Sequence, residues 1–314
     1  MLHIFLTILA PIFALVTAGW CLDRKFRLDL NTLVKLNIYG FVPCFIFVKV
    51  LSSPVVGSLA LRIVAFTAVI IMSMGLISWL IGKLARLPGP TVQSMQLTTM
   101  CYNSGNYGVP LMALAFPGVG EMMQVFVLMT MNVATFSIGT LLVVLGQHRL
   151  REAGTEGVAP WRRFLPALRQ PSIHAVMFAV LAKYLGWSEA IQESFLWPAL
   201  DHGAQALVGL ALVTLGVQLS QTKPPPLRGL LAWGLIQRLL GGPLLASGLV
   251  ILFGFQGEMA AVLIVGAGAP TAINTALLAH EFKSDATLAT GMVFYTTLLS
   301  LLTVGFTLWL MGVG

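Results

Sequence analysis

The chain has 314 residues, of which 57% are hydrophobic and only 9% are charged. Its mean hydropathy of +0.90 excludes an ordinary soluble domain and predicts an all-α membrane protein. The net charge of +7 does not indicate nucleic-acid binding, because the basic residues fall in particular loops rather than on one face. The three cysteines, Cys21, Cys44 and Cys101, are too widely spaced to predict a disulfide framework or a zinc site.

Apolar stretches of about 17–25 residues, the length that crosses a hydrocarbon core, take up nearly the whole chain. The first stretch has no basic residues before it and is followed by Arg24, Lys25 and Arg27. This order predicts a retained first span with an outward N-terminus rather than a signal peptide. We predict ten transmembrane helices, at residues 3–21, 32–51, 60–82, 92–116, 122–145, 170–187, 195–220, 229–253, 259–281 and 286–312.

Basic residues gather in alternate loops between these spans. Loops 22–31, 83–91, 146–169, 221–228 and 282–285 hold three, two, five, two and one of them, or 13 of the 18 in the chain. By the positive-inside rule these loops face the cytoplasm and both termini face outward. The opposite side carries the acidic residues Glu121, Glu189, Glu193 and Glu258.

The longest hydrophilic segment divides the spans five and five. We therefore predict a first five-helix repeat at 1–146, a basic cytoplasmic loop at 147–169 and a second repeat at 170–314. An odd number of spans in each half means that the two repeats are inverted relative to each other. An offset of 160 residues supports this weakly, since it aligns Pro11, Gly108, Pro110 and Glu121 with Pro171, Gly268, Pro270 and Glu281.

The fourth and ninth spans contain helix-breaking sequences. The fourth reads Asn103-Ser-Gly-Asn-Tyr-Gly-Val-Pro110, in which Pro110 opens its turn and frees the carbonyl of Asn106. The ninth contains Gly266-Ala-Gly-Ala-Pro270, in which Pro270 frees the carbonyl of Gly266. One such segment alone is equally well explained as a kinked packing helix. For Pro43, in the second span, we expect such a structural kink. Two, one in each half, favour a transporter's central binding site.

Half-helix N-termini present unpaired amides, which suit a carboxylate, and freed carbonyls suit a cation. Asparagine amides in the broken spans and in the fifth span either line such a site or satisfy the broken backbone. Tyrosines such as Tyr107 and Tyr295 are more typical of a core or an interface, and Asp201 and His202 of a solvated cap rather than a proton relay. The predicted substrate-binding residues are Asn103, Ser104, Gly105, Asn106, Tyr107, Pro110, Asn132, Arg238, Ala269, Pro270, Thr271 and Asn274.

Arg238 lies near the middle of the eighth span, where an arginine is costly unless it meets a partner or water. Three roles are open. It binds a substrate carboxylate bidentately, or it holds freed carbonyls of a neighbouring broken helix, or it snorkels to the cytoplasmic surface.

Asn103 to Leu111, together with Ala269-Pro270-Thr-Ala and Leu278-Ala-His-Glu-Phe282, resembles the auxin efflux carrier family. Bacterial members of that family are usually described as malate or malonate permeases. The resemblance covers the full chain and implies a homodimer in the bacterial inner (plasma) membrane. It also implies a scaffold of spans 1, 2, 6 and 7, and a mobile domain of spans 3–5 and 8–10 that cross at the broken helices and move like an elevator. The short central loop resembles bacterial members and argues against auxin itself as the substrate.

We therefore expect a secondary transporter of a small organic anion, a mono- or dicarboxylate such as malate or malonate, working by alternating access. Its coupling ion is open between a proton and sodium. A channel or a membrane sensor on the same fold is the alternative. We expect no metal or cofactor: His280-Glu281 lacks the second histidine of a zinc motif, and Gly266-x-Gly268 lacks a third glycine. An enzyme is disfavoured because no nucleophile–base pattern occurs.

Overall fold

The computed structural model describes residues 3, 5–53, 57–135, 137, 170–227, 229–281 and 283–313. The basic loop predicted at 147–169 lies outside this part of the chain. The described part is helical, with no named strand in it. Six of its helices are long and apolar enough to cross a membrane: Phe5–Phe26, Leu30–Ser52, Ser58–Leu84, Trp197–Gln221, Gly229–Leu252 and Ala286–Leu310. The prediction of an all-helical integral membrane protein is thus confirmed.

The elements follow in two series. The first comprises η1 (Phe5–Leu9), α2 (Ala10–Phe26), α3 (Leu30–Leu36), η2 (Asn37–Phe41), α4 (Val42–Ser52), α5 (Ser58–Leu84), α6 (Gly89–Met100), η3 (Ser104–Gly108), α7 (Val109–Ala115) and α8 (Val119–Ala134). The second comprises α11 (Pro171–Tyr184), α12 (Ser188–Gln192), α13 (Trp197–Gln221), α14 (Gly229–Ile236), η6 (Gln237–Gly241), α15 (Gly242–Leu252), α16 (Gly257–Ala267), α17 (Ile273–Glu281) and α18 (Ala286–Leu310).

Four π-helical turns (η) occur inside these helices, and each precedes a proline by the same distance. η1, η2, η3 and η6 end two residues before Pro11, Pro43, Pro110 and Pro243. Proline has no N–H, and its ring clashes with the carbonyl four residues back, so the turn widens there. Pro43 and Pro110 therefore act on their helices as the sequence predicted.

The predicted fourth and ninth spans are both interrupted, the fourth before Pro110 and the ninth around Pro270. The non-helical stretches are 101–103, between α6 and η3, and 268–272, between α16 and α17. Pro110 follows the first break by seven residues, whereas Pro270 lies inside the second. The carbonyl of Gly266, expected to be free, accepts from the N–H of Ala269 at 3.0 Å, because α16 has already ended at Ala267.

Corresponding elements recur at a larger spacing than 160 residues. α6 and α16 begin at Gly89 and Gly257, 168 residues apart, and η3 and α17 begin at Ser104 and Ile273, 169 residues apart. The offset of 160 is therefore wrong as a structural correspondence, because it aligned prolines that occupy different places. Both series still share one order: a long helix, an interrupted pair of helices and another helix.

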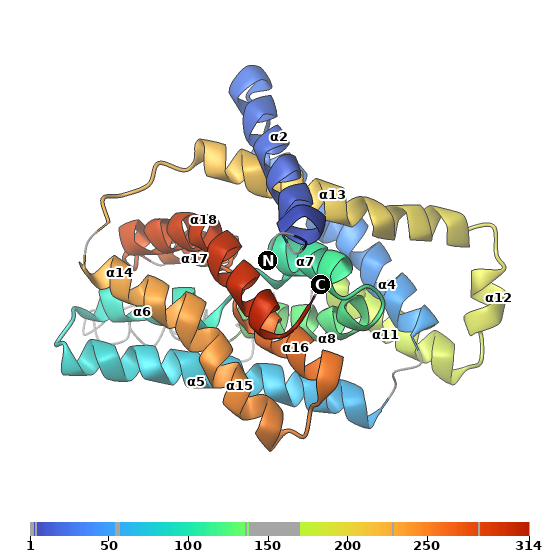
Figure 1. Ribbon diagram of the computed structural model, residues 1–314. Coiled ribbons are helices and arrows are strands. Elements are labelled where there is room, and N and C mark those ends of the chain that lie inside the picture. The colour runs from blue at the N-terminus through green and yellow to red at the C-terminus, as the bar shows by residue number, and fades with distance from the viewer. Residues whose placement is uncertain are drawn as a thin grey trace, which may run out of the picture.

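The helices pack as two groups, shown in Figure 1. The first group consists of α2, α4, α11 and α13 with their neighbours, and the second of α5 to α8 and α14 to α18. In Figure 1, α13 runs along the upper edge with α2 crossing it, and α5 runs along the lower edge. The two groups meet where α4 contacts α8 and where α13 contacts η3 and α7.

Within the first group, α2 and α13 are held at close range by two glycines. A Cβ on Gly216 would lie 2.8 Å from the backbone nitrogen of Trp20, and one on Gly19 would lie 2.9 Å from Cα of Val213. Small residues at such crossings let two backbones touch in an apolar solvent, where packing rather than the hydrophobic effect holds helices together. This contact fixes α2 and α13 relative to each other, and the second group packs against α13.

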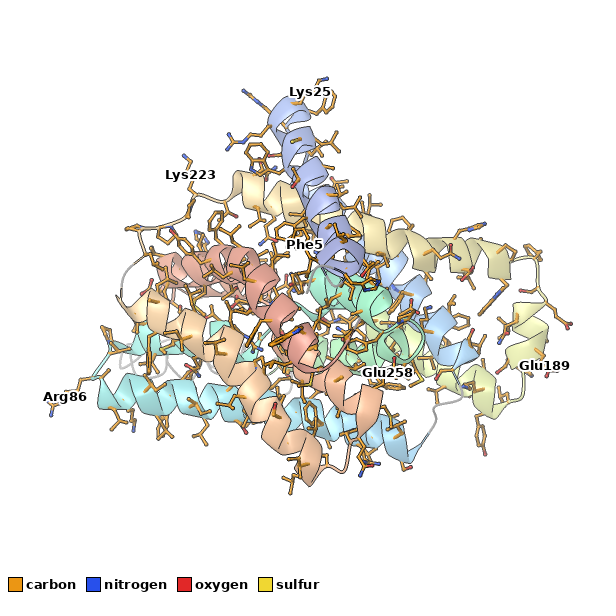
Figure 2. The ribbon with its side chains drawn as sticks, in the orientation of Figure 1. Phe5, Lys25, Arg86, Glu189, Lys223 and Glu258 are labelled. Carbon is orange, nitrogen blue, oxygen red and sulfur yellow. The ribbon has the colours of Figure 1, made fainter. Side chains whose placement is uncertain are left out.

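Figure 2 shows how charges are distributed over the helices. Lys25 and Lys223 lie toward the top of the view and Arg86 lies at its left margin, whereas Glu189 and Glu258 lie toward the right. Lys25 lies in the last turn of α2, and Lys223 and Arg86 follow α13 and α5. Glu189 and Glu258 lie at the start of α12 and α16.

Candidate functional site

The two breaks lie against each other and are joined by backbone hydrogen bonds. The N–H of Asn103 donates to the carbonyl of Pro270 at 2.7 Å, and the N–H of Ala272 donates to the carbonyl of Cys101 at 2.9 Å. Tyr102 and Thr271 form the resulting antiparallel bridge. Each break thus satisfies part of the other's backbone, which an irregular segment needs where water is scarce.

Thr271 makes two hydrogen bonds at the second break. Its hydroxyl donates to the carbonyl of Thr98 at 2.8 Å, and its N–H donates to the hydroxyl of Thr296 at 3.0 Å. Both threonine side chains are fully buried. Thr271 therefore bonds within the protein and does not face the pocket described below.

Arg238, in η6, is fully buried and reaches the ends of both preceding half-helices. Its Nη1 donates to the carbonyl of Thr99 at 2.7 Å, and its Nη2 donates to the carbonyl of Ala267. Its Cζ lies 5.0 Å from the ring centroid of Tyr102. Of the three roles open from the sequence, this geometry corresponds to the second, and full burial does not fit snorkelling.

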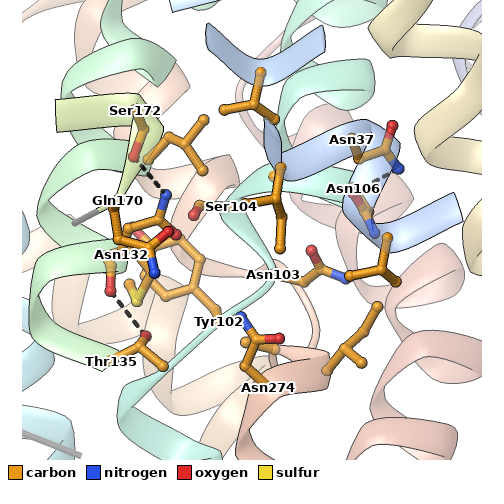
Figure 3. Close-up of a pocket in the computed structure, with 18 residues that line it drawn as sticks. Asn37, Tyr102, Asn103, Ser104, Asn106, Asn132, Thr135, Gln170, Ser172 and Asn274 are labelled. Atoms are coloured by element: carbon orange, nitrogen blue, oxygen red, sulfur yellow. Dashed lines mark hydrogen bonds between the residues drawn. The ribbon is translucent and has the colours of Figure 1, made fainter. Parts of the chain in front are cut away.

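A pocket of about 80 Å³ lies beside the crossing breaks, where the two groups of helices meet. Figure 3 shows amide side chains converging on it: Asn132 and Gln170 from one side, Asn37 and Asn106 from the other, with Asn103 and Asn274 below. Its remaining lining is made by Val34, Ile38, Val42, Tyr102, Ser104, Gly105, Leu128, Met131, Thr135, Ser172, Ala272 and Ile273.

Both helices that follow the breaks begin at this pocket. η3 starts at Ser104 and α17 at Ile273, and both residues line it. The first amides of a helix have no intrahelical acceptor and carry the positive end of its dipole. The two helix starts therefore give the pocket a positive potential.

Two buried atoms of the lining lack a partner within the described protein. These are Nδ2 of Asn103, a donor, and Oδ1 of Asn37, an acceptor. Asn37 is held in place by donating to the hydroxyl of Thr214 at 3.1 Å. Among the lining residues that the structure describes there is no Asp, Glu, Lys, Arg or His. The pocket can therefore hold a polar ligand with neutral groups and helix dipoles, but it offers neither a catalytic base nor a set of metal ligands.

A side-chain hydrogen bond from a neighbouring helix holds the residues that follow the first break. Nε2 of Gln124, on α8, donates to the carbonyl of Ser104 at 2.5 Å. A Cβ on Gly108 would lie less than 3.0 Å from that same nitrogen, so glycine is needed there for Gln124 to reach. Gln124 thus performs the structural role that the sequence left open for the asparagines.

The structure brings half of the predicted site residues together. Those that line the pocket are Asn103, Ser104, Gly105, Asn106, Asn132 and Asn274. Those that lie outside its lining, all of them buried, are Tyr107, Pro110, Arg238, Ala269, Pro270 and Thr271. Tyr107 packs in the main apolar core, as its residue type suggested.

Sequence reasoning missed the lining residues that the first group of helices supplies, above all Asn37, Gln170 and Ser172. Asn37 carried a usable signal, because it is an amide inside an apolar span, the same feature that singled out Asn132. Gln170 is the N-cap of α11, Ser172 lies in its first turn, and both are ordinary helix-start residues. Only the packing of α11 on α4 and η2 brings them to the pocket.

Comparison with known proteins finds similarity to membrane transporters. The family model described as a membrane transport protein matches residues 162–309. An uncharacterized transporter of Methanocaldococcus jannaschii is 26% identical over 290 residues, 90% of this chain and 89% of its own length. Another, of Methanothermobacter thermautotrophicus, is 26% identical over 281 residues, 88% of this chain and 87% of its own length. These matches agree with the resemblance found in the sequence and indicate a transporter rather than an enzyme.

Proposed function

We propose that this membrane transport protein moves a small organic anion, a mono- or dicarboxylate such as malate or malonate, by alternating access. The observation that carries the proposal is the uncharged pocket at two helix starts, whose lining includes Asn103 with its unpartnered Nδ2. A carboxylate is the ligand class that such donors favour, because hydrogen bonds to a charged acceptor contribute about 1.5–3 kcal/mol each.

The size of the pocket supports a small ligand. Drug-sized molecules occupy pockets of about 300–1,000 Å³, several times the cavity described here. A four-carbon dicarboxylate would place one carboxylate at the start of η3 and leave the other for Asn132 and Ser172. Asn37, with its free acceptor oxygen, would bond a hydroxyl or a protonated carboxyl group of the ligand.

The division of the helices supports movement about this pocket. Asn37, Gln170 and Ser172 belong to the first group, and the remaining amides of the lining belong to the second. The hydrogen bonds that join the groups at the pocket are long, 3.5 Å from Asn37 to Asn106 and 3.4 Å from Asn132 to Ser172. We propose that the first group is the scaffold and the second, with its crossed half-helices, is the mobile domain of an elevator within ten spans.

A ligand screen tests the substrate class. Purified protein is heated with mono- and dicarboxylates, and with matched amides and amines as uncharged and cationic controls. A carboxylate that binds the folded protein at 100 times its Kd raises the free energy of unfolding by about 2.7 kcal/mol. The shift should disappear in Asn103→Ala. Stabilisation by the amides or amines in place of the carboxylates would contradict the anion proposal.

A counterflow experiment separates a carrier from the alternative, a channel or sensor on the same fold. Proteoliposomes loaded with unlabelled carboxylate should transiently accumulate labelled carboxylate from outside, because a carrier exchanges one bound ligand for another. Accumulation that never exceeds equilibrium, with flux that does not saturate, would favour a channel.

We further propose an inward-facing central loop, outward termini and a homodimer. Single cysteines at positions 121 and 156 test the orientation in intact cells, position 156 lying outside the described residues. An impermeant reagent should label 121 and not 156; the reverse pattern would invert the topology. Light scattering in detergent measures the oligomeric state.

A further inference from the structure

The carbonyls that Arg238 holds are those that the two breaks leave without a helical donor. In an uninterrupted helix, Thr99 would accept from the N–H of Asn103, and Ala267 from that of Thr271. Both N–H groups are committed elsewhere, to Pro270 and to Thr296. Arg238 therefore bonds one orphaned carbonyl from each half of the chain with one guanidinium.

Charge as well as hydrogen bonding is balanced at this junction. α6 and α16 both end here, and the C-terminal end of a helix carries about half an elementary negative charge. Two such ends together match the single positive charge of Arg238. No Asp or Glu is recorded as its partner among the described residues, where the one ion pair joins Lys49 to Glu121. The cation at this junction is thus balanced by helix ends rather than by an acid.

We infer that Arg238 is a resident cation: its fixed charge joins the ends of the two half-helices in the place where a transported or coupling cation would otherwise bind. Carbonyl oxygens of this kind are the ligands that alkali ions take in membrane proteins. Two consequences follow. The wild-type protein needs no metal ion at this junction, and removing the guanidinium leaves a vacancy that sodium or potassium can fill.

The connection to the pocket runs through Tyr102, which lines the pocket and also lies against Arg238. Arg238 is therefore a positioning residue. It holds the ends of α6 and α16, and those ends set where η3 and α17 begin. This part of the inference rests on the proposed function, but the charge of the junction does not, and its test needs no substrate.

The test compares the melting temperature of purified Arg238→Lys, Arg238→Met and Arg238→Ala with the wild type, each in sodium, potassium and choline chloride. A resident cation predicts that Lys is tolerated better than Met, although Met is the more readily buried side chain. Arg238→Ala should melt at least about 3 °C higher in sodium or potassium than in choline, and the wild type should show no difference. Met equal to or better than Lys, or Arg238→Ala indifferent to the cation, overturns the inference.

Two neighbouring glycines provide a control that keeps the charge. A Cβ on Gly242 would lie 2.7 Å from Nη2 of Arg238 and closer still to the carbonyl oxygen of Ala267, the donor and the acceptor of one hydrogen bond. On Gly241 the nearest atom is Cγ of Gln237 at 3.8 Å. Gly242→Ala should therefore lower the melting temperature in all three salts, while Gly241→Ala behaves like the wild type. If Gly242→Ala is as stable as Gly241→Ala, the guanidinium is not held as the structure shows it.

Variants that do not survive purification are compared as fluorescent fusions in detergent extracts of cells. The quantity compared is the fraction of the fusion that elutes as a single species. Lys above Met again supports a resident cation, and a tie or the reverse order overturns it. With a substrate in hand, wild-type uptake should be unchanged when choline replaces sodium. Loss of uptake under that exchange also overturns the inference, while failure to find any carboxylate substrate bears only on the proposed function.

Discussion

At the first break Asn103 lines the pocket and its Nδ2 donor has no partner, whereas at the second break the N–H and the hydroxyl of Thr271 both donate within the protein. The first interrupted helix also supplies five lining residues in a row, Tyr102 to Asn106. The second supplies three, Ala272 to Asn274, of which only Asn274 has a polar side chain. The two halves are thus alike in architecture but differ at their breaks: the first supplies more of the pocket lining, and the second makes more of its hydrogen bonds within the protein.

The largest effect should come from exchanging the polar residue at each break. Asn103→Ala removes a donor that has no protein partner, so the melting temperature should change little while carboxylate affinity falls about 10–100-fold, the worth of a hydrogen bond to a charged group. Thr271→Val should do the opposite. It leaves the carbonyl of Thr98 unsatisfied, at a cost of about 1–3 kcal/mol in stability. Isothermal titration and thermal unfolding measure the two quantities, and equal behaviour of the two variants would break the comparison.

The two prolines should differ for a related reason. Pro110→Ala allows the turn at η3 to close into an α-helical turn, which shifts Ser104 and Asn106 against the pocket; we expect uptake to fall about tenfold with folding retained. Pro270 lies in the non-helical stretch 268–272, so the N–H that alanine adds there would not restore a helical hydrogen bond. Pro270→Ala should reduce uptake less and mainly loosen the second break. Uptake per folded molecule measures both, and wild-type rates in both variants would remove the broken helices from the mechanism.

Alanine at matched glycines gives a smaller effect that depends on side-chain packing. In Gly108→Ala the new Cβ displaces Gln124 from the carbonyl of Ser104, so both stability and uptake should decline, stability by about 1–3 kcal/mol. In Gly266→Ala the nearest atom is Cε of Met112 at 3.4 Å, the end of a flexible side chain, so little should change. Denaturation in detergent checks the pair. Greater damage from Gly266→Ala would mean that the second break is the more constrained one.

The smallest effect concerns the acidic residues at the start of α8 and α16. Glu121 forms an ion pair with Lys49 at 2.9 Å, between α8 of the second group and α4 of the first, whereas Glu258 is exposed. Such a partly exposed pair contributes up to about 1 kcal/mol, or about fivefold in a conformational equilibrium. Glu121→Gln should therefore change the rate of carboxylate exchange across the membrane by no more than that factor. In this variant the rate should no longer depend on salt concentration. Glu258→Gln serves as the control. If the exchange rate changes as much in Glu258→Gln, the ion pair between Glu121 and Lys49 does not control movement between the groups.

The sequence alone determined the membrane class, the approximate helices and the presence of two breaks, because each follows from local chemistry. A long apolar stretch has to span or be buried, and glycine and proline interrupt helices whatever surrounds them. It also indicated that Arg238 needs a partner or water, since a charge in mid-span is costly, but it left three roles open. The same local reasoning put the first break at Pro110, and there it failed, because α6 ends where the second break supplies hydrogen bonds.

Only the tertiary structure decided which polar groups line the pocket and which form hydrogen bonds within the protein. Asn103 and Thr271 both lie in a broken span, and nothing in their own sequence context says that one finds a partner and the other does not. That outcome depends on Thr98 and Thr296, which other helices bring to Thr271. Asn37, Gln170 and Ser172 reach the pocket for the same reason, from helices distant in sequence. A hydrogen bond needs its partner within about 3 Å, and between separate helices only their packing sets that distance.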